Sequence, residues 1–115
     1  IKTDGLAPYR FSIVIENVRE KNYFSEKLVD AILCRTVPIY WGCPNIGDFF
    51  DTRAMVLCES LEDIQTAVST MSAADYDTRL PALSAMLPTA ESYADIQMRA
   101  AQAILNCIQS EHPGK

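Results

Sequence analysis

Two short polar stretches carry the residue types that could do chemistry. The first is Glu16-Asn17, directly after an apolar run, and the second is Tyr23-Phe24-Ser25-Glu26-Lys27. An ammonium group near a helix start can neutralise a phosphate, and a carboxylate can accept hydrogen bonds from sugar hydroxyls. An adjacent Glu-Lys pair at a helix start is also typical of a solvated surface. The residue types alone therefore leave both interpretations open.

The elements predicted around these stretches place both of them at one edge of a sheet. The β-branched and aromatic run Phe11–Ile15 predicts a strand buried on both faces, and a helix is expected over residues 24–34, capped by Ser25 or Asn22. The β-rich run 36–41 predicts the next strand. In an open parallel sheet, ligands bind beyond the carboxyl ends of the strands, where the following helices begin. We therefore expect the two polar stretches to surround one cleft.

The rest of the chain continues this alternation and then becomes helical. We expect a short helix over 46–50, a strand over 54–58, a helix over 61–71 opened by a capping box of Ser60 and Asp63, and two helices over 75–87 and 90–108 separated near Pro88. Alternating strands and helices predict a parallel sheet with helices on its faces. The expected fold class is α/β, a Rossmann-like parallel sheet with flanking helices and a helical carboxyl-terminal region, in a single domain over residues 1–115.

Composition excludes several classes of function. The chain has 115 residues, 49% of them hydrophobic, and a net charge of −5 without a lysine or arginine cluster, so nucleic acid is not an expected partner. Its apolar runs are too short for a membrane span. The four cysteines, Cys34, Cys43, Cys58 and Cys107, form no C-x-x-C pair, and His112 is the single histidine. We expect core or incidental thiols, with no metal site and no cofactor.

Three ordered motifs resemble the α-1,3-fucosyltransferase family in its carboxyl-terminal, donor-binding half. They are Tyr9-Arg-Phe-Ser-Ile-Val-Ile-Glu-Asn17, Tyr23-Phe-Ser-Glu-Lys27, and Thr36-Val-Pro-Ile-Tyr-Trp-Gly42 with Pro44-Asn45 and Phe49 after it. The likeness covers roughly residues 9–51, and three motifs in matching order are more specific than any one of them. It implies half of a two-domain GT-B fold, so this chain is expected to be a piece of a longer enzyme. Ser25 stands where the family usually has threonine; it keeps the hydroxyl, and the resemblance implies that it belongs to the donor-binding residues.

The resemblance also implies roles for individual residues. Tyr23, Glu26 and Lys27 would contact the nucleotide sugar, with Lys27 on the diphosphate and Glu26 on ribose or sugar hydroxyls. Glu16 and Asn17 would line the same pocket. In the family the catalytic base and most acceptor contacts come from the amino-terminal domain, so no catalytic residue is expected in this chain.

The resulting hypothesis is a fucosyltransferase-like glycosyltransferase domain that binds a GDP-sugar, GDP-fucose by resemblance, for inverting transfer to an acceptor saccharide. The alternative is a noncatalytic nucleotide-binding or protein-interaction module on the same scaffold, and a third option is a glycosyltransferase that uses another nucleotide sugar. The isolated chain is expected to be inactive, and to self-associate through the apolar wall that would face a second domain. Localisation stays open: the cytoplasm for a bacterial protein, the Golgi lumen for a eukaryotic one.

Overall fold

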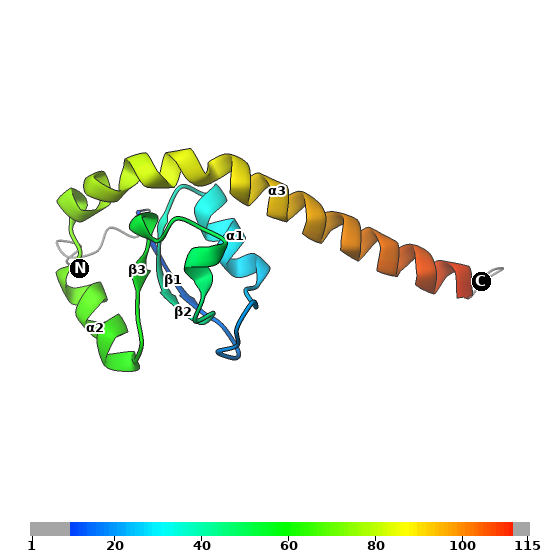
Figure 1. The fold of residues 1–115 in the computed structure, drawn as a ribbon, viewed down its shortest axis with the longest axis horizontal. Coiled ribbons are helices and arrows are strands. Elements are labelled where there is room, and N and C mark those ends of the chain that lie inside the picture. Colours follow the sequence, from blue (N-terminus) through cyan, green and yellow to red (C-terminus); the bar gives the residue numbers. More distant parts are fainter. Residues whose placement is uncertain (1–9, 112–115) are drawn as a thin grey trace.

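Three parallel strands form a sheet in the order β1-β2-β3 (Figure 1). The computed structural model describes residues 10–111, so Tyr9 of the first motif and His112 lie outside the described residues. The strands are β1 (Phe11–Ile15), β2 (Val37–Trp41) and β3 (Val56–Leu57). In the register, Phe11 lies opposite Val37 and Ile39 opposite Val56. The predicted class, strand adjacency and parallel direction are confirmed, although β3 is shorter than expected.

Five helices follow one another along the described chain, and α1 and α2 begin with the side-chain caps that their sequences provide. They are α1 (Glu26–Leu33), the 3-10 helices η1 (Ile46–Asp48) and η2 (Thr52–Ala54), α2 (Leu61–Thr70) and α3 (Ala73–Glu111). The Ser25 hydroxyl accepts a hydrogen bond from the Lys27 amide at 3.2 Å, so Ser25 is the cap of α1. At α2 the Ser60 hydroxyl accepts from the Asp63 amide at 3.1 Å, and the Asp63 carboxylate accepts from the Glu59 amide at 2.9 Å. The predicted helix start at Ser60 is confirmed.

Helix α3 covers the amino ends of the strands and leaves their carboxyl ends to loops. The Tyr76 hydroxyl donates to the Arg35 carbonyl at 2.8 Å, just before β2, and the Tyr76 ring meets Phe11 at 6.1 Å. Arg79 Nε donates to the Met55 carbonyl at 3.4 Å, just before β3. From there α3 runs along α1 and extends past it, while α2 lies on the other side of the sheet (Figure 1). The edge at which we expected a ligand therefore stays accessible.

Strand β1 is not buried on both faces, contrary to the prediction. Ile13 and Ile15 are 49% and 47% exposed. β1 is an edge strand, and the helices of the described region leave this part of its face uncovered. Ile15 instead lines an open cavity of about 200 Å³ together with Trp41 and Leu61. The apolar run shows that both faces are hydrophobic, whereas burial also requires an element to cover each of them.

The two predicted carboxyl-terminal helices form one continuous helix, with Pro81 and Pro88 inside it. A proline in a helix interior costs about 3 kcal/mol because it removes a hydrogen bond and crowds the preceding turn. Leu83 and Met86 before Pro88 and Ala90 after it are all buried. Full burial of a Leu or Met side chain contributes about 1.5–3 kcal/mol, so packing on both sides of Pro88 offsets its cost. The split predicted at Pro88 is wrong for this reason.

The thiols divide evenly between the inside and the outside of the molecule. Cys43 and Cys58 are buried, Cys34 and Cys107 are exposed, and all four are free. Burial raises the pKa of the Cys58 thiol, and nearby acidic side chains raise it further. Within residues 10–111, no group of three His, Cys, Asp or Glu side chains is placed to hold a metal ion. The same region contains no helix that is long and apolar enough to cross a membrane.

Candidate functional site

The predicted site residues lie on the loop from β1 to α1 and on the first turn of α1, at the carboxyl edge of the sheet. Tyr23, Glu26 and Lys27 are exposed, and so is Asn17 in the loop. Ser25 is partly buried as the cap of α1. The structure therefore brings a phenol, a carboxylate and an ammonium group to one helix start by chain continuity.

Glu16 differs from the other predicted site residues because it is buried, at 3% exposure. Its Oε2 atom accepts hydrogen bonds from the Ser25 amide at 3.0 Å and from the Tyr40 hydroxyl at 2.9 Å. The Tyr40 oxygen in turn accepts from the Cys43 amide at 3.1 Å. Burial raises the pKa of Tyr40 well above its usual value, and the Glu16 carboxylate raises it further, so the phenol stays protonated and donates. Glu16 thus ties the end of β1 to the start of α1 and to β2.

An aromatic cluster anchors the chain between Tyr23 and Ser25. The ring of Phe24 lies 5.4 Å from that of Phe49, 5.2 Å from Phe50 and 5.1 Å from Tyr93 of α3. Tilted and edge-to-face pairs at these distances are attractive in addition to their burial. Phe24 therefore packs inward while Tyr23 is exposed.

The loop from β1 to α1 is tied to the rest of the molecule at two further points. Arg19 Nη2 lies 2.7 Å from Glu59 Oε1, in an exposed ion pair with the loop before α2. Asn22 bonds reciprocally with Asn45 in the turn after β2. These contacts join residues 40 and 23 positions apart, so no local spacing in the sequence could have revealed them. Asn22, which the sequence allowed as a cap of α1, serves instead as such a tie.

Lys27 supplies the positive charge at the start of α1. The amides of Ser25, Lys27 and Leu28 already have acceptors within the chain. Attraction of an anion to this helix start therefore depends chiefly on the ammonium group. Lys27 and Asp30 line an open cavity of about 360 Å³ between β1 and α1. Neither Tyr23 nor Glu26 lines this cavity, so the structure joins the three groups through the chain and not through one pocket. An ammonium group at this place can bind a phosphate.

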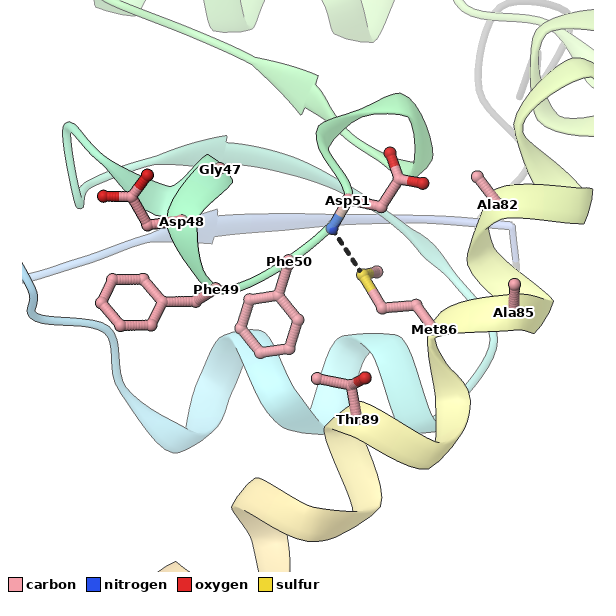
Figure 2. A pocket seen from close by; sticks show the side chains of 9 residues that line it. All are labelled: Gly47, Asp48, Phe49, Phe50, Asp51, Ala82, Ala85, Met86 and Thr89. Atoms are coloured by element: carbon pink, nitrogen blue, oxygen red, sulfur yellow. Dashed lines mark hydrogen bonds between the residues drawn. The ribbon is translucent and has the colours of Figure 1, made fainter.

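A second cavity, of about 320 Å³, lies between the segment 47–51 and α3 and is unsuited to an anion (Figure 2). The Asp51 amide donates to Met86 Sδ at 3.3 Å across it. Its charged lining groups are the carboxylates of Asp48 and Asp51. Hydrogen bonds from Arg53 hold the pKa of Asp51 below its usual value, so this carboxyl group stays ionised. Like charges would repel a phosphate here, whereas the start of α1 carries the positive charge of Lys27.

Comparison with known protein families gives a match over most of the described chain. Residues 2–80 match the family described as glycosyltransferase family 10 (fucosyltransferase), C-terminal part. The matched region contains all three strands, α1 and α2. The part of α3 beyond residue 80 lies outside the match.

Individual relatives align with a similar part of the chain. An alpha-(1,3)-fucosyltransferase, FucT, of Helicobacter pylori is 31% identical over 67 residues, which are 58% of this chain and 14% of the relative. The alpha-(1,4)-fucosyltransferase of Arabidopsis thaliana is 35% identical over 52 residues, 45% of this chain and 13% of that protein. The GDP-fucose protein O-fucosyltransferase 3 of Bos taurus is 32% identical over 75 residues, 64% of this chain and 16% of that protein. The chain thus spans only 13–16% of the length of these relatives. No solved structure matches the chain significantly.

Proposed function

Since this chain belongs to glycosyltransferase family 10, the fucosyltransferases, and matches their carboxyl-terminal domain, we propose that the start of α1 binds the donor GDP-fucose. One observation carries the proposal: the stretch Tyr23–Lys27 lies within the family match and at the exposed carboxyl edge of a parallel sheet. Nucleotide ligands of open α/β sheets bind at this edge. The three-stranded sheet with its flanking helices agrees with the Rossmann-like half of a GT-B fold.

Each exposed group at this edge has a role in the proposal. The Lys27 ammonium pairs with the diphosphate, and the Glu26 carboxylate accepts hydrogen bonds from hydroxyls of the ribose or the sugar. Tyr23 contacts the nucleotide sugar, and Asn17 lines the same pocket. Glu16 supports the pocket from behind, because its carboxylate holds the Ser25 amide.

The proposed reaction is an inverting transfer, and the chain supplies its donor side. A base removes the proton of an acceptor hydroxyl, the hydroxyl oxygen attacks the anomeric carbon of fucose, and the bond from that carbon to the diphosphate breaks. Negative charge grows on the departing GDP, and Lys27 stabilises it. The base and the acceptor site belong to another part of the whole protein, so the 115-residue chain alone is proposed to show no turnover.

The proposed acceptor is a saccharide, joined in α-1,3 linkage. The motif resemblance and the name of the Helicobacter pylori relative support this choice. Relatives named for α-1,4 transfer and for protein O-fucosylation match too. A domain that holds the donor is expected to be shared among such enzymes, because acceptor and linkage are selected elsewhere.

Lys27→Ala in the whole protein tests the diphosphate contact. Loss of a charge-assisted hydrogen bond to a phosphate costs about 1.5–3 kcal/mol, so calorimetric titration should show roughly ten- to more than a hundredfold weaker binding of GDP and GDP-fucose. Lys27→Arg should restore binding in part, because the planar guanidinium approaches a phosphate differently. Lys21→Ala is the matched control, since it removes the same charge from an exposed lysine of the loop that precedes α1. Equal effects of the two alanine variants would show that only net charge matters.

Glu26→Gln separates recognition of the hydroxyls from recognition of the diphosphate. The variant keeps the shape of the side chain but removes its charge, so it should weaken GDP-fucose binding more than binding of inorganic diphosphate. Unchanged affinities in all of these variants would contradict the donor site. Tight binding of GDP-fucose without transfer to any saccharide would favour the noncatalytic module, and preference for a different nucleotide sugar would reassign the donor.

A further inference from the structure

The side chain of Asn45 uses both its carbonyl and its amino group to hold the loop that carries the proposed donor contacts. Its Oδ1 atom accepts from the Asn22 amide at 2.8 Å and lies 3.0 Å from Cys43 Sγ. Its Nδ2 atom donates to Asn22 Oδ1 at 2.8 Å and to Asp48 Oδ2 at 3.0 Å. Two hydrogen bonds in opposite directions therefore join Asn45 to the same residue of the loop.

Asn22 has a backbone conformation that needs such support. Its φ angle of 65° lies in the left-handed region, which asparagine visits more readily than most residues but which is unfavourable for a side chain in isolation. Asn45 stabilises this conformation by binding both the backbone N–H and the side-chain carbonyl of Asn22, in addition to the turn in which the Tyr23 amide donates to the Glu20 carbonyl at 3.2 Å. The backbone angles of Asn22 determine where the next residue, Tyr23, lies.

Contacts with other elements hold the backbone on both sides of Tyr23. On its carboxyl side, the Phe24 ring sits in the aromatic cluster and the Ser25 amide bonds to buried Glu16. On its amino side, the reciprocal pair with Asn45 is the nearest tie to another element. The next tie, between Arg19 and Glu59, is an exposed ion pair and stabilises weakly.

We propose that Asn45 is a positioning residue of the donor site: it sets the place of Tyr23 through Asn22 and does not itself contact the donor. This inference rests on the proposed function of the α1 start. A displaced Tyr23 would weaken binding of donor and GDP alike, whereas the departing diphosphate would still meet Lys27. Loss of Asn45 is therefore expected to act on affinity more than on the rate of the bound complex.

Asn45→Ala in the whole protein should raise the KM for GDP-fucose and the Kd for GDP by roughly five- to tenfold, the change expected for one or two neutral hydrogen bonds, with little change in kcat. Asn45→Asp keeps an acceptor for the Asn22 amide, but it loses the donor and places a second carboxylate beside Asp48, so its KM should also exceed that of the parent. Asn106→Ala removes the same side chain from an exposed site on α3 and should leave KM and kcat unchanged.

Asn22→Gly tests the same contact from its other side. Glycine adopts a positive φ freely and lacks the carbonyl that Asn45 Nδ2 binds. If Asn45 acts through Asn22, Asn45→Ala should raise KM less in the Asn22→Gly protein than in the parent. Hydrogen exchange of the Asn22 amide should be faster in Asn45→Ala than in the parent.

The outcomes separate this inference from the function on which it rests. Weak GDP binding in Lys27→Ala with a normal KM in Asn45→Ala would overturn the positioning role and leave the donor site standing. Unchanged GDP binding in Lys27→Ala would remove the donor site itself, whatever Asn45 does. An Asn45→Ala protein with lower kcat and unchanged KM, or effects of Asn45→Ala and Asn22→Gly that simply add, would also overturn the positioning role.

Discussion

Gly42 lies where a side chain would collide with buried groups that hold the loop from β1 to α1. A Cβ atom at this position would overlap the Glu16 side chain and lie 2.7 Å from the Tyr40 hydroxyl oxygen. Both neighbours are buried and hydrogen-bonded to each other at 2.9 Å, so neither can move away without losing a bond. The absence of a side chain at Gly42 therefore allows Glu16 to reach Ser25.

Gly42→Ala is expected to destabilise the fold by about 1–3 kcal/mol, the usual cost of overpacking a core. Urea unfolding of the 115-residue chain would measure it. Gly47→Ala is the matched control, because a Cβ atom there would meet only Thr52 Cγ2 at an ordinary 3.5 Å. Equal stability of the two variants would show that the space around Gly42 adapts.

At the scale of elements, α3 is a helix that continues through a residue, Pro88, that disfavours helix formation. Pro88 lacks the N–H that a helix interior uses, yet the helix continues from Ala73 to Glu111. Its packed part carries Leu83, Met86 and Ala90 on the buried side, and Tyr93 reaches the aromatic cluster of Phe24. Tertiary contacts, and not helix propensity, hold the two halves in one helix.

Pro88→Ala is expected to stabilise the chain by about 1–2 kcal/mol, because alanine restores the missing hydrogen bond and removes the clash of the proline ring. The gain is smaller than the full propensity difference, since proline also restricts the unfolded chain. Urea unfolding followed by far-ultraviolet circular dichroism would measure it. Unchanged or lower stability would indicate that α3 bends or breaks at this residue in solution.

At the scale of the whole molecule, exposed apolar side chains gather on two surfaces of the region from residue 10 to residue 111. One is the uncovered face of β1 with Ile13 and Ile15, next to Leu61. The other is the end of α3, where Met98, Ile104, Leu105 and Ile108 are all exposed. This end projects beyond the rest of the molecule (Figure 1).

The 115-residue chain is therefore expected to self-associate in solution, because exposed apolar patches of this kind favour contact with another surface. Sedimentation velocity over a wide concentration range should show a species larger than the monomer. Replacing Ile13 and Ile15 by glutamate, or Leu105 and Ile108 by glutamate, would identify which surface is responsible. A monomer at every concentration would contradict the prediction.

Local patterns in the sequence determined the order and type of most elements. Apolar runs and capping residues identified β1, β2, α1 and α2, because the periodicity and the cap of a short strand or helix lie within its own segment of sequence. The stretch Tyr23–Lys27 could be placed at a helix start for the same reason. The assignment of a fucose donor came from motif resemblance and not from spacing, and the roles of the site residues remain predictions.

Only the tertiary structure decided which surfaces are covered and which distant groups meet. Exposure of Ile13, burial of Glu16 and continuity of α3 through Pro88 all depend on what packs against each element, which periodicity does not record. The pairing of Asn22 with Asn45 exists because the parallel register of β1 and β2 brings the loops at their carboxyl ends together. The sequence shows which faces of each segment are apolar and which groups are polar. Which groups these contact depends on how segments far apart along the chain are arranged.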